Sequence, residues 1–364
     1  MEQSLTLLER LVKSFVTVGL LSVACFTASV AAGLPGGVPA RASTQTYSIT
    51  DLGTLNGGFE TDAYDINSNG QVVGQAVEKV TTGSSYNYLW HAFLYSGGAL
   101  TDLGTLGGDY SEARAINKYG NVAGYSNLCA ACYTYDAFLY HSGHMTDLGT
   151  LGGTGSQAYG INDLGEVVGE ASTPASQDAF LYTGGKMTNL GALGAYGSTA
   201  LGINNSHQVV GYSSLPNSSY SHAVLWSNGT ISDLGTLGGS TSAAYAINGV
   251  GQIVGYAYTS KGATHAFLYS GGKMTDLGTL GYGDTSVAKA INGSGVVVGT
   301  ASTSYGYHAF IYSSGKMQDL NNMIPAGSGW VLTDATGITD TGQVVCNAKN
   351  TITYSNHALL LTPS

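Results

Sequence analysis

The chain has 364 residues and a formal charge of −10, yet only 9% of its residues are charged, so it can bury a large core. Its 54 glycines and 25 tyrosines, beside few Glu, Lys and Arg, favour short strands joined by glycine turns over helices. An acidic chain lacks the cationic surface that phosphate backbones require, which argues against a nucleic-acid partner.

The N-terminal residues 1–32 are expected to form a signal peptide, with a linker at 33–46. Basic residues precede an apolar run at 15–30, and cleavage is expected after Ala31 or Ala32. The mature protein is then secreted and extracellular, with the periplasm or the cell surface as variants, and it has no membrane span. An uncleaved anchor is the alternative, although the apolar run is short of the ~20 residues that a span needs.

Cys129 and Cys132 form a C-x-x-C pair, which in an exported protein most often makes a local disulfide. A zinc site would need about four ligands, and no second cysteine pair exists in the sequence. Cys346 replaces a glycine of the repeat described below, and we expect it to be buried. The sequence therefore predicts a Cys129–Cys132 disulfide and neither a metal nor a cofactor.

Two strings recur seven times along the chain. DLG and its variants begin 42 to 51 residues apart, at Asp51, Asp102, Asp147, Asn189, Asp233, Asp276 and Asp319. HAFLY and its variants begin at His91, Asp136, Asp178, His222, His265, His308 and His357. Between them lies a third element, such as AYAINGVGQIVGYA at 244–257, in which two apolar runs flank an N-x-x-G turn as in a hairpin.

Each repeat thus contains two hairpins, or four strands, and neighbouring repeats must cover each other's faces. Periods of about 40 to 45 residues with four strands are typical of propeller blades. We therefore predict an all-β, seven-bladed β-propeller of four-stranded antiparallel blades at 47–364. The first strand, which starts at Tyr47, should pair with the last strand at 357–361 and close the ring, which removes open edges. A straight β-solenoid is the alternative.

The segment HAFLYSGGKMTDLGTLGG, followed by A-x-x-I-N-x-x-G-x-V-V-G, resembles the HAF-repeat family of bacterial proteins, which are expected to be extracellular. The resemblance covers residues 47–361 and includes a longer terminal repeat at 319–338. It implies an exported repeat protein, and it supplies no catalytic residues that could be carried over to this chain.

The two kinds of connection between strands differ sharply. The N-x-x-G and Gly-Gly turns are short and uniform, whereas the loops at the opposite strand ends vary and are rich in Tyr, Ser, Asn and Gly. Such loops suit recognition. We expect a polar ligand, a carbohydrate or a cell-surface component, to stack on Tyr86, Tyr88, Trp90, Tyr133, Tyr135, Tyr220, Tyr305, Tyr307 and Trp330. The alternative is that these rings only fill gaps between loops.

Several polar residues of the repeats have both a possible metal-binding or catalytic role and a structural one. The His or Asp that opens each HAFLY could form a metal-binding ring, but a position that accepts both is better explained by a repeated hydrogen bond. Asp65 begins a partial calcium-loop pattern that lacks a downstream acidic ligand. A glycosidase would need two facing carboxylates, and non-repeating acids occur at Glu60, Asp62, Glu112, Asp163, Glu170 and Asp284.

The sequence contains no G-x-S-x-G or H-E-x-x-H motif and no phosphate-binding loop. It therefore favours a non-enzymatic, monomeric binding protein. A propeller enzyme acting on polysaccharide and a purely structural surface protein are the alternatives.

Overall fold

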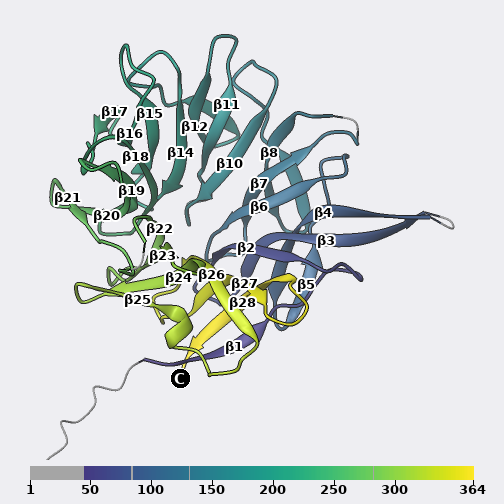
Figure 1. The fold of residues 1–364 in the computed structure, drawn as a ribbon. Coiled ribbons are helices and arrows are strands. Elements are labelled where there is room, and N and C mark those ends of the chain that lie inside the picture. The colour runs from purple at the N-terminus through teal and green to yellow at the C-terminus, as the bar shows by residue number, and fades with distance from the viewer. Residues whose placement is uncertain (1–44, 83–84, 131, 282) are drawn as a thin grey trace, which may run out of the picture. The chain divides into compact units, whose positions relative to one another are not determined.

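The computed structural model describes residues 45–364 except 83–84, 131 and 282, and at 82, 85 and 86 it describes only the backbone. The expected signal peptide, and all of the linker but its last two residues, lie outside the described residues. In the described part, 28 strands form seven four-stranded antiparallel sheets, arranged as the blades of a β-propeller (Figure 1). The predicted fold class is confirmed.

The blades follow one another along the chain. Blade 1 consists of β2 (Thr61–Ile66), β3 (Val72–Thr82), β4 (Ser85–Ser96) and β5 (Ala99–Asp102). Blade 2 consists of β6 (Ser111–Ile116), β7 (Val122–Asn127), β8 (Tyr135–His141) and β9 (His144–Asp147). Blade 3 consists of β10 (Ser156–Ile161), β11 (Val167–Ser172), β12 (Gln177–Thr183) and β13 (Lys186–Asn189). Blade 4 consists of β14 (Ser198–Ile203), β15 (Val209–Ser214), β16 (Ser221–Ser227) and β17 (Thr230–Asp233).

The remaining blades complete the ring. Blade 5 consists of β18 (Gly238–Ile247), β19 (Ile253–Thr259), β20 (Thr264–Ser270) and β21 (Lys273–Asp276). Blade 6 consists of β22 (Ser286–Ile291), β23 (Val297–Thr303), β24 (Gly306–Ser313) and β25 (Lys316–Asp319), and a short 3-10 helix, η1 (Leu320–Asn322), follows it. Blade 7 consists of β26 (Trp330–Ile338), β27 (Val344–Asn350), β28 (Asn356–Pro363) and β1 (Tyr47–Asp51).

Blade 7 is built from both ends of the described chain. β1 pairs antiparallel with β28, in a register that runs from Tyr47 opposite Pro363 to Asp51 opposite Leu359. His357 Nδ1 lies 2.9 Å from Asp51 Oδ2 and adds a side-chain contact to this pairing. The predicted closure is confirmed. β28 pairs with β27 on one side and with β1 on the other, so β28 has no open edge.

The core lies between the blades. A fully buried phenylalanine from the HAFLY string occupies the third strand of five blades, as Phe93 does in blade 1. Phe93 belongs to one apolar cluster with Val345 and Leu360 of blade 7, so each blade covers the face of its neighbour. Cys346 is buried, as predicted.

Polar side chains tie the blades together at the N-x-x-G turns. The asparagine of each A-x-x-I-N string donates a hydrogen bond to the backbone oxygen of the equivalent residue in the next blade, for example from Asn117 to Asn162 at 3.1 Å. Six such bonds join blades 1 to 7 in succession. In blade 7 this position holds Thr339, and the junction to blade 1 is bridged by Thr336, whose hydroxyl donates to the Ala63 oxygen at 3.0 Å.

The repeated His and Asp side chains form a clip in five of the seven blades. His222 Nδ1 lies 2.9 Å from Asp233 Oδ2, and the other oxygen of Asp233 accepts the Gly235 backbone N–H at 2.7 Å. Where blade 3 has Asp178 instead of histidine, Asn189 donates to it at 2.7 Å. In blade 2 the two positions hold Asp136 and Asp147, which are not hydrogen-bonded to each other in the described part of the chain, and burial and the charge of Asp147 raise the pKa of Asp136. The predicted backbone N–H bond to the DLG residue is confirmed, whereas the same hydrogen bond at the His/Asp position in every blade is wrong for blade 2.

The carboxylate of Asp65, considered above as a calcium ligand, accepts hydrogen bonds from backbone N–H groups. Its two oxygens accept the N–H groups of Ile66 at 2.8 Å and of Ile116 at 2.9 Å. Burial raises its pKa to about 6. Helices are scarce in the described part of the chain, and none of them is long and apolar enough to cross a membrane.

Candidate functional site

One position of the repeat lines the central channel. It is the first variable residue of A-x-x-I-N on the inner strand of each blade, and the structure places there Tyr64, Arg114, Tyr159, Leu201, Tyr245, Lys289 and Thr336. We call these seven residues the channel ring. The residues on either side of this position are nearly constant, which makes the channel ring the chemically most varied layer of the inner strands.

A β-bulge produces this arrangement in every blade. The pairing register of the inner strand with the second strand shifts between Ala63 and Asp65 in blade 1, which leaves Tyr64 as the extra residue, and the same shift recurs in the other six blades. A bulge redirects the side chain of its extra residue. The fold therefore aims seven different side chains at one axis.

A cavity of about 380 Å³ lies above the channel ring, on the side of the variable loops. We call it the mouth cavity. Besides the channel ring it is lined by Thr199, Tyr212 and Asp334. This volume is within the range of small-molecule sites, about 300 to 1,000 Å³.

Arg114 anchors one side of the mouth cavity. Its Nε lies 2.5 Å from Glu112 Oε1, and its guanidinium carbon lies 4.3 Å from the centre of the Tyr64 ring. The other oxygen of Glu112 accepts the hydroxyls of Tyr110 and Tyr125, each at 2.6 Å. Burial has the largest single effect and lowers the pKa of Arg114, but Glu112, Tyr125 and Tyr64 together raise it above its ordinary value, so the guanidinium stays charged. This side is a rigid network with its charges paired.

Lys289 lies in a more open part of the cavity lining. Its Nζ lies 5.0 Å from the centre of the Tyr245 ring, and within the described residues it forms no ion pair at 4.0 Å or less. Asp334 is buried nearby, and its Oδ1 has no hydrogen-bond partner in the described part of the chain. Burial raises the pKa of Asp334, and the positive charge of Lys289 lowers it in part. The Lys289 ammonium thus lines the cavity without an ion pair within the described residues, whereas Asp334 Oδ1 is itself buried and is not exposed to the cavity.

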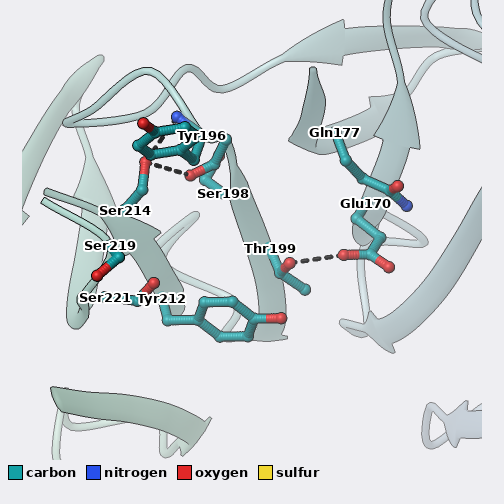
Figure 2. A pocket seen from close by; sticks show the side chains of 10 residues that line it. Glu170, Gln177, Tyr196, Ser198, Thr199, Tyr212, Ser214, Ser219 and Ser221 are labelled. Atoms are coloured by element: carbon teal, nitrogen blue, oxygen red, sulfur yellow. Dashed lines mark hydrogen bonds between the residues drawn. The ribbon is translucent and has the colours of Figure 1, made fainter.

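Glu170 connects the channel ring to blade 4. Its Oε1 accepts the Tyr159 hydroxyl at 3.2 Å, and its Oε2 accepts the Thr199 hydroxyl at 2.6 Å (Figure 2). Burial and the charge of Glu170 raise the pKa of Tyr159, which keeps this phenol protonated as a donor. Both carboxylate oxygens of Glu170 are therefore already engaged.

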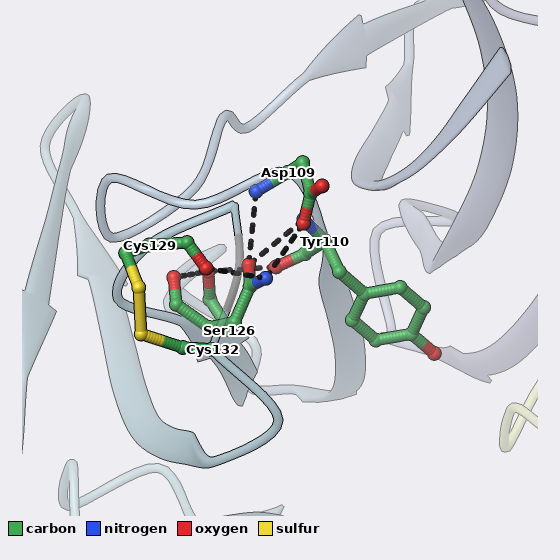
Figure 3. The surroundings of a disulfide bond; sticks show 6 residues. Asp109, Tyr110, Ser126, Cys129 and Cys132 are labelled. Carbon is green, nitrogen blue, oxygen red and sulfur yellow. Dashed lines mark hydrogen bonds between the residues drawn. A yellow bond between two sulfur atoms is a disulfide. The ribbon is translucent and has the colours of Figure 1, made fainter. Parts of the chain in front are cut away.

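A disulfide braces the rim of the mouth. Cys129 and Cys132 are bonded, and the Cys129 oxygen accepts a hydrogen bond from the Asn127 side chain at 3.1 Å (Figure 3). The side-chain oxygen of Asn127 in turn accepts the backbone N–H groups of Asp109 at 3.0 Å and Tyr110 at 2.9 Å. The bonded loop thus holds Tyr110 in position to donate to Glu112.

Of the aromatic residues predicted from the loops, Tyr135 packs against Tyr110 and Tyr125, the two tyrosines that donate to Glu112, and a ligand role for it stays a prediction. Its ring centre lies 5.4 Å from that of Tyr110 and 5.5 Å from that of Tyr125. Trp330 begins β26 rather than lying in the preceding loop, and it packs 5.3 Å from the His357 ring. Trp90 is half-buried on β4. A ligand role for Trp90 and Trp330 stays a prediction.

The remaining aromatic residues belong to four blades, and Tyr88 and Tyr307 lie on strands β4 and β24. Tyr88 packs edge-on against Phe59 at 5.1 Å. Four others are exposed, up to 97% for Tyr133, and no ring contact joins any of them to another within the described residues: Tyr133, Tyr220, Tyr305 and Tyr307. The side chain of Tyr86 lies outside the described residues. The structure does not gather these rings into one surface, and their role stays a prediction.

A three-residue group in blade 1 offers donor atoms for a metal ion. Glu78, His91 and Asp102 place one donor atom each within 4.8 Å of one another. His91 and Asp102 form the clip that four other blades repeat, and Glu78 adds a contact of 3.0 Å to the same ring nitrogen. The hydrogen bond from His91 to Asp102 is the largest cause of the raised pKa of His91. The two carboxylates thus face the same ring nitrogen, Nδ1, and favour the charged form of the imidazole.

Sequence reasoning missed the channel ring. The signal was present, because A-x-x-I-N keeps its alanine and isoleucine while the residue after the alanine changes from Tyr64 to Arg114 and Lys289. Of the acids considered for catalysis, Glu112 and Glu170 lie at the mouth, and their oxygens are engaged as described above.

Comparisons with known proteins agree on the fold. A family model described as "Protein of unknown function (DUF3466)" matches residues 193–360, and no curated protein matches the sequence. The chain is similar to the β-propeller domain of the trilobed protease from Pyrococcus furiosus, with 11% identity and a TM-score of 0.58 over 85% of this chain and 94% of that one.

Two further solved structures extend the comparison. Oligogalacturonate lyase in complex with manganese gives 9% identity and a TM-score of 0.50 over 88% of this chain and 99% of that one. TolB from Acinetobacter baumannii gives 11% identity and a TM-score of 0.45 over 81% of this chain, which spans 63% of that protein. At 11% and 9% identity, the likeness to the trilobed protease domain and to oligogalacturonate lyase shows the propeller fold alone, which hosts unrelated functions.

Proposed function

We propose that this chain is an exported, non-enzymatic propeller that binds an acidic carbohydrate in the mouth cavity. The observation that carries the proposal is Lys289, a cation that faces the cavity beside the Tyr245 ring without an ion pair within the described residues. The sequence resemblance to HAF-repeat proteins and the expected signal peptide support the exported location.

The lining of the mouth cavity suits a ring-shaped ligand with a carboxylate. Arg114 and Lys289 are two of only nine basic residues in 45–364, and both line this cavity. The rings of Tyr64 and Tyr245 offer flat apolar faces to the C–H face of a sugar, while Thr199 and Thr336 offer hydroxyls for orientation. A charge-assisted bond to Lys289 would supply about 1.5 to 3 kcal/mol of the binding energy.

The contacts of the mouth carboxylates favour binding over hydrolysis. A glycosidase needs one carboxylic acid that can give its proton and a second carboxylate that is free to act. Glu112 pairs with Arg114 and accepts two tyrosine hydroxyls, and Glu170 accepts one hydroxyl on each oxygen. These bonds support a positioning role for both carboxylates. Asp334 is the one acidic residue in the lining of the mouth cavity itself, so the second carboxylate that hydrolysis requires is not supplied by that lining.

The test is an array of acidic and neutral oligosaccharides, followed by calorimetric titration with glucuronic acid. Lys289→Gln should weaken binding of acidic sugars by roughly 10- to 150-fold, the equivalent of one charge-assisted bond. Lys273→Gln is the matched control, because Lys273 is exposed at the Gly-Gly turn of blade 5, away from the cavity. Unchanged binding by the Lys289 variant would refute the proposal, and an array without any bound glycan would favour a structural role.

A further inference from the structure

A second pocket of about 390 Å³ lies between blades 3 and 4 on the side of the variable loops. We call it the interblade pocket. Blade 3 contributes residues from β11 and β12, and blade 4 contributes β14, β15 and the loop before β16 (Figure 2). Its lining includes Glu170, Gln177, Tyr196, Tyr212, Ser219 and Ser221.

The interblade pocket adjoins the mouth cavity. Thr199 and Tyr212 line both of them, so the two spaces meet at these side chains. The bond from Thr199 to Glu170 crosses from blade 4 to blade 3 and joins their walls at 2.6 Å. A ligand long enough to extend past Tyr212 would therefore contact both linings.

The lining of the interblade pocket is polar and aromatic. It contains no aliphatic side chain and no lysine or arginine. Gln177, Ser219 and Ser221 form no side-chain hydrogen bond within the described residues, so their donors and acceptors are open to a ligand. Tyr196 is 76% exposed and presents its ring at the edge. Amides, hydroxyls and tyrosine faces are complementary to the hydroxyl groups and C–H faces of a sugar.

The two spaces differ in charge. The mouth cavity holds Arg114 and Lys289, whereas the only charged group in the lining of the interblade pocket is the Glu170 carboxylate. A second carboxylate on the ligand would be repelled there, because like charges in a partly desolvated site disfavour each other. A sugar hydroxyl, in contrast, can donate to the remaining lone pairs of Glu170.

We infer that the interblade pocket is a second saccharide subsite, and that the ligand is an oligosaccharide with an acidic unit in the mouth cavity and a neutral unit in the interblade pocket. This inference rests on the proposed function and adds the length and composition of the ligand. A peptide fits the lining less well, because no apolar contact for aliphatic side chains is provided.

The experiment compares three probes by calorimetry on the mature chain: glucuronic acid, aldobiouronic acid (glucuronate linked to xylose) and digalacturonate. Aldobiouronic acid should bind at least tenfold more tightly than glucuronic acid, and digalacturonate should not share this gain. In Gln177→Ala/Ser219→Ala the gain should disappear while affinity for glucuronic acid is unchanged. Both side chains are exposed, and thermal unfolding will verify that the fold is retained.

The matched control is Ser260→Ala/Thr264→Ala, which truncates hydroxyls in the equivalent loop of blade 5 and should leave all affinities unchanged. If Lys289→Gln weakens glucuronic acid but the xylose unit adds nothing, or adds as much in the double variant, the second subsite is refuted and the proposed function stands. If Lys289→Gln has no effect, the proposed function itself fails. Tighter binding of a diglutamate peptide than of aldobiouronic acid would overturn the saccharide class.

Discussion

Replacing Asn248 by alanine should remove one of the bonds that join the blades. Asn248 is only 6% exposed, and its side chain makes four hydrogen bonds at the turn of blade 5. Its oxygen accepts the N–H groups of Val250 at 3.2 Å and Gln252 at 2.9 Å. Its nitrogen donates to Gln252 Oε1 at 2.8 Å and, across the junction to blade 6, to the Asn292 oxygen at 3.0 Å.

The expected loss of stability follows from these partners. Alanine leaves two backbone N–H groups and one interblade carbonyl without their partner, each worth about 1 kcal/mol, and a poorly hydrated site raises this cost. We therefore expect Asn248→Ala to lower the free energy of unfolding by about 3 to 4 kcal/mol. For an unfolding entropy near 2.1 cal/mol/K per residue, the melting temperature should fall by about 5 °C.

Blade 7 provides the matched variant. Thr339 holds the equivalent position there, and its hydroxyl accepts the Gln343 N–H at 3.1 Å. Asn248→Thr should therefore retain one turn bond and lose about 1 kcal/mol less than Asn248→Ala. Calorimetry and urea unfolding of both variants will measure the difference. A loss below about 1 kcal/mol for alanine, or equal losses for the two variants, would refute the role assigned to the asparagine bonds.

Two further predictions concern pH and the disulfide. Burial raises the folded-state pKa of Asp65 from 3.8 to about 6, so the wild type should lose about 2.4 kcal/mol of stability relative to Asp65→Asn as pH rises from 4 to 7. A pH-independent difference in urea unfolding would contradict this. Replacing Cys129 and Cys132 by serine should lower the free energy of unfolding by about 2 kcal/mol. It should also weaken the binding of glucuronic acid, because Tyr110 is then held less firmly. An unchanged affinity in calorimetric titration would contradict the bracing role of the disulfide.

The repeats in the sequence were sufficient to predict the fold. DLG and HAFLY recur 42 to 51 residues apart and mark the strands of each repeat. The pairing of β1 with β28 follows because the first repeated string belongs to a fourth strand and the last belongs to a third. Both features depend on local hydrogen bonding and on packing that every blade repeats. The His222–Asp233 clip was predictable for the same reason, since its two residues are 11 apart in one hairpin.

The site was predicted only in part. Composition pointed to tyrosines on the variable loops, and Tyr135 packs against Tyr110 and Tyr125 beside the Glu112–Arg114 pair, without lining the mouth cavity. The exposed rings at Tyr133 and Tyr305 were chosen by the same rule and lie apart. The composition of a loop gives the types of its residues. The direction of each side chain depends on contacts between loops of different blades, which composition does not specify.

The sequence by itself determined the strand pattern, the number of blades and the closure of the ring, because each of these repeats a local rule. Only the tertiary structure decided that Arg114 and Lys289 share one cavity, although 175 residues separate them in the chain. The physical reason is that a bulge turns one residue per blade toward a common axis, and seven blades must close before that axis exists.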